Sequence, residues 1–205
     1  MFELIKSIRE RDEAEPTFME VVLAYPGFHM MTIFHPVAHR LWKWNLRALA
    51  RLWSAIGRII TGIEIHPGAT IGRNLFIDHG TGTVIGQTAV IGDNCRLYQA
   101  ITLGGRGKII DGRRHPILLD NVTIGAGAHV LGPLIIGQDA KIGAGSLVTM
   151  DIPAGMTAIG NPARLVGEIH SSGAAYGLPD GEMPDPVAIE IDEKIHELME
   201  GHHDH

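Results

Sequence analysis

The sequence predicts a mainly β fold, in which a solenoid of six-residue repeats follows a helical N-terminal segment and precedes an acidic tail. Three observations lead to this class: an aliphatic residue recurs every six positions through the middle of the chain, glycines number 26, and apolar residues before position 62 have helical spacing. A period of six fits neither an α-helix nor an ordinary sheet. Six residues can form one short strand and one turn, with the aliphatic side chain inside a narrow prism and glycine in turns that need positive φ.

Residues 1–61 are predicted to form a helical domain. Six apolar residues alternate four and three positions apart, which predicts one apolar stripe along a helix. They are Trp42, Leu46, Leu49, Trp53, Ile56 and Ile60. Pro26 and Pro36 are expected to break the preceding apolar stretch into short helices. Basic residues cover much of the remaining helix surface, a pattern that also suits a membrane surface, but we favour burial of the stripe against a neighbouring element.

Residues 62–168 are predicted to form the solenoid, because two arrays of aliphatic residues keep the six-residue register. The first array contains Ile65, Ile71, Ile77, Ile85, Ile91, Leu97 and Leu103. The second array contains Leu118, Ile124, Val130, Ile136, Ile142 and Val148. A glycine-rich segment of low complexity would not keep such a register.

The register departs from six at two places. It slips by two residues after Ile77, and it breaks across residues 104–117, where fifteen positions separate Leu103 from Leu118. The excess residues must leave the prism as a loop, and insertions in repeat proteins commonly carry binding functions. Five residues make this loop basic: Arg106, Lys108, Arg113, Arg114 and His115. Charge alone leaves a solvated loop and a binding site equally open.

The slip contains the motif FIDHGTG, in which His79 stands between an aspartate and a glycine. A histidine can take a proton from a hydroxyl near neutral pH, and a carboxylate at its other ring nitrogen fixes the tautomer. Glu64 and Asp78 are the candidate carboxylates. His79 is therefore a candidate general base, although the residue types alone leave a structural histidine equally open.

Several motifs occur together over roughly residues 10–168: IEIHPGATIG, LFIDHGTGTVIGQTAVIGDN, LYQAITLGGRGK, GRRHP, VTIGAGAHVLG, AKIGAGSLV and GNPARLV. Together they resemble the motifs of bacterial serine O-acetyltransferases, within the hexapeptide-repeat acyltransferase superfamily. The combination of DHGTG with RRHP is much more specific than hexads alone. The resemblance implies a left-handed parallel β-helix that transfers an acetyl group from acetyl-CoA to L-serine, the first step of cysteine biosynthesis.

The resemblance also implies roles for residues. His79 takes the position of the catalytic base, and Glu64 takes that of its orienting carboxylate, which is usually an aspartate. Four residues are implied to bind the amino acid, the acids near its amino group and the cations near its carboxylate: Asp78, Asp12, Arg114 and His115. Six residues fall where the family holds coenzyme A: Gly104, Gly105, Ala126, Lys141, Ala144 and Arg164. Since no cysteine or serine takes the position of a nucleophile, we expect direct attack in a ternary complex, without a metal.

The resemblance further implies a homotrimer whose active sites are shared between neighbouring subunits, and feedback inhibition by L-cysteine. Many members form a dimer of trimers through a longer helical domain; here that domain has only about 60 residues, which argues against the hexamer but leaves it open. Many members dock O-acetylserine sulfhydrylase through a C-terminal isoleucine, whereas this chain ends in GHHDH, which puts such docking in doubt. Two other classes stay open: a related acetyltransferase for homoserine, a sugar or another hydroxyl or amine acceptor, and a metal-dependent or non-enzymatic β-helix.

The formal charge of −6 is unevenly distributed. Residues 1–170 carry 16 basic and 14 acidic residues, whereas residues 171–205 carry one and nine. The acidity therefore belongs to the predicted tail, 169–205, and the slightly cationic remainder suits an anionic cofactor. The tail histidines, His202, His203 and His205, are expected to be solvated. The negative formal charge argues against nucleic-acid binding. The charged N-terminus lacks the apolar core of a signal peptide, and the sequence has no run of about 18 apolar residues that could span a bilayer. We therefore expect a cytoplasmic protein that does not enter membranes.

Overall fold

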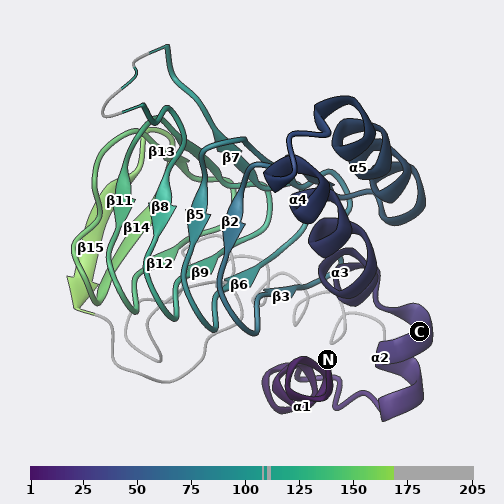
Figure 1. The fold of residues 1–205 in the computed structure, drawn as a ribbon. Helices are drawn as coiled ribbons and strands as arrows, with labels where there is room; N and C mark the ends of the chain where they lie inside the picture. The colour runs from purple at the N-terminus through teal and green to yellow at the C-terminus, as the bar shows by residue number, and fades with distance from the viewer. Residues whose placement is uncertain (108, 110–111, 169–205) are drawn as a thin grey trace, which may run out of the picture.

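The computed structural model describes residues 1–107, 109 and 112–168, and the predicted acidic tail lies outside the described residues. Helical elements occupy the N-terminal part, and Figure 1 shows them beside the first coils of a prism of short strands. They are α1 (Phe2–Arg11), α2 (Phe18–Ala24), α3 (Pro26–His29), the π-helix η1 (Met30–Phe34), α4 (His35–Lys43) and α5 (Arg47–Thr61).

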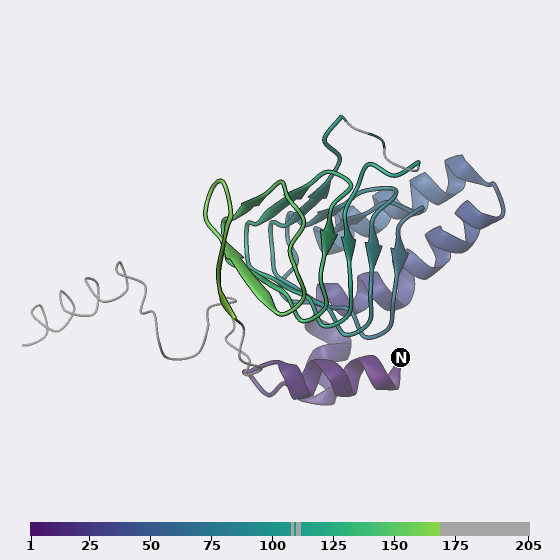
Figure 2. The ribbon, with the colours of Figure 1, turned by 90° about the vertical axis from the view of Figure 1, so that its left-hand side faces the viewer.

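Three sheets form the walls of the prism, and successive strands of the chain pass from one wall to the next (Figures 1 and 2). Sheet A contains β1 (Glu64–Ile65), β4 (Val84–Ile85), β7 (Thr102–Gly104), β10 (His129–Leu131) and β13 (Leu147–Val148). Sheet B contains β2 (Thr70–Ile71), β5 (Val90–Ile91), β8 (Ile117–Leu118) and β11 (Ile135–Ile136). Sheet C contains β3 (Phe76–Ile77), β6 (Arg96–Leu97), β9 (Thr123–Ile124), β12 (Lys141–Ile142), β14 (Met156–Ile159) and β15 (Arg164–Glu168). All pairs are parallel except β14 with β15.

The strand register confirms the six-residue repeat, since one strand and one turn make each side of a coil. Val84 pairs with Thr102, 18 positions further on, which is three hexads. Glu64 pairs with Val84, 20 positions on, so the first coil contains the two additional residues. The aliphatic positions point into the prism, where Ile65, Leu103 and Ile142, for example, are at most 1% exposed. Burial of these aliphatic side chains, which come from all three sheets, stabilises the stack.

The second departure from the register lies between β7 and β8. Val90 in β5 pairs with Ile117 in β8, 27 positions further on, so nine residues beyond three hexads leave the prism there. Figures 1 and 2 show this segment projecting from the prism at the edge between sheets A and B.

The apolar stripe predicted for residues 42–60 is only partly buried, so this prediction was wrong in detail. Trp53 and Ile56 pack against the core, but Leu49 and Ile60 are 52% and 63% exposed. The buried positions of α5 are instead small or polar: Ala50, Ser54, Gly57 and Thr61. These positions also have helical spacing, and small side chains allow the helix backbone to approach its neighbours closely. A Cβ at Gly57 would lie only 2.8 Å from Cβ of Phe34 in η1.

The two prolines act differently from each other. Pro26 begins α3, as predicted, whereas Pro36 does not interrupt the helical run, because it lies in the first turn of α4, directly after η1. The backbone N–H of His35 donates to the carbonyl of Met30, five residues back, which is the π-helical pattern. Among the described residues no single helix has the length and apolar character to cross a bilayer; α2 taken with the run Pro26–Lys43 passes by length and composition, but with a 72° bend.

Candidate active site

The two additional residues of the first coil lie in the turn from β3 to β4, at the edge between sheets C and A. His79 has φ of +55° in this turn, in the left-handed region that non-glycine residues rarely adopt, and its side chain is 73% exposed. The ring Nε2 lies 3.8 Å from Oδ1 of Asp78. Other turns of the prism adopt the same conformation, for example at Asn74 and Asn94, so the feature that distinguishes this turn is an exposed histidine beside a carboxylate. The slip in the repeat therefore presents an accessible base.

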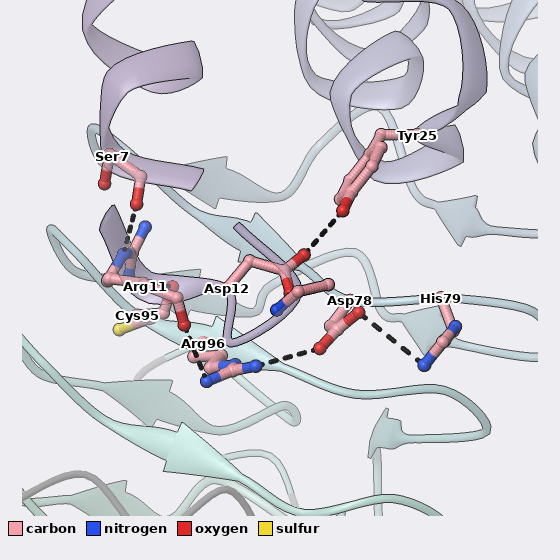
Figure 3. Close-up of polar contacts among 9 residues, drawn as sticks. Ser7, Arg11, Asp12, Tyr25, Asp78, His79, Cys95 and Arg96 are labelled. Carbon is pink, nitrogen blue, oxygen red and sulfur yellow. Dashed lines mark hydrogen bonds and ion pairs between the residues drawn. The ribbon is translucent and has the colours of Figure 1, made fainter. Parts of the chain in front are cut away.

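The Asp78 carboxylate is held from its other side. Its Oδ2 accepts from Nη2 of Arg96 at 2.9 Å, and the two side chains are only 13% and 15% exposed (Figure 3). Nη1 of Arg96 donates to the backbone carbonyl of Arg11 at 3.0 Å. The guanidinium also lies over the rings of Phe76 and Tyr98, 5.1 and 4.7 Å from their centroids. Asp78 thus has a fixed orientation toward His79.

Asp12 follows directly after α1 and lies near the same group (Figure 3). The hydroxyl of Tyr25 donates to Oδ2 of Asp12 at 2.6 Å, and the backbone N–H of Ala14 donates to Oδ1 at 2.9 Å. Burial raises the pKa of the Tyr25 phenol, and the carboxylates of Asp12 and Asp78 raise it further. Arg96 binds both Asp78 and the carbonyl of Arg11, the residue before Asp12, so the structure brings these two predicted residues into one group.

Arg11 anchors the Asp12 segment to the prism. Its guanidinium donates to the carbonyls of Asn74 (2.6 Å) and Asn94 (2.8 Å), which belong to the turns before β3 and β6. Burial, and then the neighbouring Arg96, lower the pKa of Arg11 to about 10, so it remains a cation at neutral pH. Sequence reasoning missed Arg11, Arg96 and Tyr25, because nothing in the repeat pattern predicts contacts between α1 and sheet C.

A cleft of about 830 Å³ lies between the end of α1 and sheet C. Asp12 and Arg96 line it together with Lys141 of β12, one of the residues implied to bind coenzyme A. Arg96 and Lys141 stand in one column of sheet C, on either side of Thr123. The cleft therefore extends from Asp12 and Arg96 to the later coils of the prism.

Arg114 and His115 lie at a different edge, between sheets A and B, where the loop rejoins the prism. The hydroxyl of Thr88 accepts from both of their backbone N–H groups, and Nδ1 of His115 lies 2.9 Å from the same oxygen. The His115 ring packs on Gly86, where any Cβ would overlap it. Burial lowers the pKa of His115, with the Arg114 charge acting in the same direction. The backbone N–H of Thr88 also donates to Nδ1 of His115 at 3.2 Å, so these contacts fix the orientation of the ring at this edge.

The residues implied to bind coenzyme A are divided in the same way. Gly104 and Gly105 lie at the edge between sheets A and B, where the loop begins, whereas Ala126 and Ala144 lie in turns between sheets C and A. Arg164 belongs to β15 of sheet C. Within one chain, each predicted binding set therefore occupies two edges of the prism.

Glu64 lies in β1, directly beside the turn that carries His79. Its backbone N–H donates to the carbonyl of Thr83, and Gly82 donates to the carbonyl of Gly62. The Glu64 carboxylate accepts from Nη1 of Arg58 at 3.0 Å. Among the described residues, the carboxylate in contact with the His79 ring is that of Asp78. No three histidine, cysteine or acidic side chains in the described part of the chain are grouped as metal ligands, and the tail histidines lie outside that part.

Parallel hexapeptide coils with an exposed histidine in a widened turn define a hexapeptide-repeat transferase. The family pattern described as "Bacterial transferase hexapeptide (six repeats)" matches residues 115–149. Serine acetyltransferase of Synechococcus elongatus is 49% identical over 182 residues, which are 88% of this chain and 72% of the relative. Serine acetyltransferase of Mycobacterium tuberculosis is 46% identical over 188 residues, 92% of this chain and 80% of the relative. The chain belongs to the serine acetyltransferase family.

Solved structures agree with this assignment. Soybean serine acetyltransferase complexed with serine is 46% identical, with a TM-score of 0.75, over 79% of this chain and 66% of that chain. Serine acetyltransferase of Brucella abortus in complex with coenzyme A is 42% identical, with a TM-score of 0.77, over 80% of this chain and 65% of that chain. The chain thus spans about two thirds of the length of these solved relatives. The fold is the left-handed parallel β-helix of the family.

Proposed function

We propose that this protein transfers the acetyl group of acetyl-CoA to the hydroxyl of L-serine, which yields O-acetyl-L-serine and coenzyme A and begins cysteine biosynthesis. The relatives named above carry this activity in their names, and two of the solved ones hold serine or coenzyme A. The observation that carries the proposal is the exposed His79 beside the oriented Asp78, in the turn where the repeat is widened by two residues.

His79 acts as the general base in this proposal. Its ring takes the proton of the serine hydroxyl as the oxygen bonds to the thioester carbonyl carbon, and the tetrahedral intermediate then expels the coenzyme A sulfur. The proton held by His79 passes to the departing thiolate, so the ring ends neutral. Asp78 stabilises the imidazolium from 3.8 Å, and Glu64, beside the same turn, is the second carboxylate able to do so when it leaves Arg58.

Substrate binding uses the two separate groups of residues. Asp12 and Asp78 hold the ammonium group of serine, and Arg114 with His115 hold its carboxylate. Gly104, Gly105, Ala126 and Ala144 let the pantetheine arm approach the backbone, and Lys141 with Arg164 neutralise the coenzyme A phosphates.

The protein works as a homotrimer in this proposal, because one chain separates the residues that must meet. His79 and Asp78 lie at the edge between sheets C and A, whereas Arg114 and His115 lie at the edge between sheets A and B. A three-fold axis parallel to the prism can place the first edge of one copy against the second edge of the next. Sedimentation equilibrium tests this assembly, with six chains as the result for two associated trimers and one chain as the result that refutes it.

L-Cysteine acts as a feedback inhibitor in this proposal, since it presents the same ammonium and carboxylate groups as serine to the same residues. Inhibition competitive with serine is expected. No inhibition at cysteine concentrations well above the serine KM would reject this part.

The test of the function is release of free thiol from acetyl-CoA in the presence of L-serine. His79→Ala should lower kcat by on the order of a hundredfold or more, the usual contribution of a general base. Full activity of a folded His79→Ala protein would refute the mechanism. Homoserine, serinol and a simple sugar serve as comparison acceptors, and higher kcat/KM for an acceptor without an amino acid group would refute the substrate assignment.

A further inference from the structure

Arg96 stands on the outer side of sheet C, where the repeat by itself has no need of a charge. Its neighbour Leu97 points into the prism, and its partners in the adjoining coils are Phe76 and Thr123. The α1 segment covers this part of the sheet, so the Arg96 side chain is only 15% exposed. Burial of a cation in such a place costs free energy unless the cation is paired and hydrogen-bonded.

The contacts of Arg96 join two parts of the chain that are far apart in sequence. One nitrogen of its guanidinium donates to Asp78, in the turn that carries His79, and another donates to the carbonyl of Arg11, 85 positions away. That carbonyl belongs to the peptide bond between Arg11 and Asp12. One rigid planar group therefore sets the distance between the two carboxylates that receive the substrate ammonium group.

The orientation of Asp78 also depends on this contact. Arg96 occupies Oδ2, which leaves Oδ1 directed toward Nε2 of His79 (Figure 3). Phe76, which is fully buried, and Tyr98, which is 5% exposed, prevent the guanidinium from turning away. A lysine in this position could reach one of the two partners as a point charge, but it could not hold both in a plane.

We propose that Arg96 is a positioning residue that sets serine affinity by holding Asp78 and the Asp12 segment at the spacing required by the substrate ammonium group. This inference rests on the proposed function, since it concerns the same site. The proposed role of Arg96 acts through its contacts with Asp78 and the carbonyl of Arg11, and not through contact with the reacting atoms.

The test is the pattern of steady-state constants in Arg96→Met. The KM for L-serine should rise by about tenfold or more, and the KM for acetyl-CoA should stay within about twofold of the wild-type value. Arg96→Lys should lie between the two proteins, because it keeps the charge opposite Asp78 and loses the second contact. Arg73→Met is the matched control, since it also removes an Arg–Asp pair of the prism, but one whose arginine side chain is 80% exposed.

Thermal unfolding separates positioning from a structural role. The inference is overturned if the KM for L-serine stays within about twofold of the wild-type value in both Arg96 variants. It is also overturned if the KM values for L-serine and acetyl-CoA rise equally and the Tm falls. If Arg96→Met does not fold, the Arg96→Lys values decide. Failure of the proposed function is distinct from these results, because the wild-type protein would then not acetylate serine at all, and the KM comparison would be made with the amino acid acceptor that it does use.

Discussion

A shared active site makes a quantitative prediction for mixed assemblies of two inactive variants. His79→Ala removes the base at the edge between sheets C and A, and Arg114→Ala removes the carboxylate-binding cation at the edge between sheets A and B. Loss of one charge-assisted hydrogen bond costs about 1.5–3 kcal/mol, which corresponds to roughly ten- to a hundredfold in kcat/KM for Arg114→Ala. Each variant alone should therefore have little activity.

Co-expression of the two variants should restore activity. In a trimer, a complete site needs His79 from one subunit and Arg114 from the next, so random assembly of equal amounts gives about one half times one half, or about one quarter of the sites intact. Two different affinity tags allow isolation of the trimers that contain both variants, and each of these has one complete site out of three. In the thiol-release assay their kcat/KM per chain for L-serine should therefore be about one third of the wild-type value, against about one quarter for the unselected mixture.

A second mixture provides the control. Wild-type chains co-expressed with the double variant His79→Ala/Arg114→Ala should retain about one quarter of the sites if each site is shared, but about one half if each chain carries its own site. Absence of recovery in the first mixture, or one half in the second, would refute the shared site and with it the reason for the trimer.

Three further predictions concern the turn, the helices and pH. Asp78→Asn should lower kcat by on the order of a hundredfold and Glu64→Gln by less than about threefold, because Asp78 faces His79 and Arg58 holds Glu64; the reverse order would identify Glu64 as the orienting carboxylate. Gly27→Ala should destabilise the protein by about 1–3 kcal/mol in urea unfolding and lower activity, since its Cβ would overlap the carbonyl of Ile77, next to Asp78. Burial, and then His39, lower the pKa of His35 from 6.5 to about 4. The stability that depends on the neutral His35 ring is therefore fully present above pH 6.5 and is lost as the pH falls from 6.5 to about 4. This loss is about 3 kcal/mol in the free energy of unfolding, and a His35→Leu protein with the same pH slope would contradict it.

The solenoid was predictable because its physical cause is local. Each side of a coil needs one buried aliphatic side chain and a turn, many of which have positive φ, and this pattern recurs every six residues. The widened turn at His79 was predictable for the same reason, since two extra residues displace the later aliphatic positions. The helix before the solenoid was harder, because α5 has two faces with helical spacing. Only packing selects the face with Ala50 and Gly57 over the one with Leu49 and Ile60.

The contacts that hold the site were beyond sequence reasoning. Arg11 reaches Asn94, 83 positions away, and Arg96 reaches back to Arg11 across 85 positions, so no short motif contains both partners. The side chains are ordinary surface types, and their burial follows only from the placement of α1 on sheet C. The same holds for Tyr25, which meets Asp12 because α2 and α3 turn the chain back toward the prism.

The sequence by itself determined the repeat, the widened turn with its histidine, and the family motifs, because each depends on residues close together in the chain. The tertiary structure decided which carboxylate faces His79, which arginines hold the acids, and that the two groups of binding residues occupy different edges of one prism. These features arise from the winding of coils and the docking of helices, which bring together residues that local periodicity cannot relate.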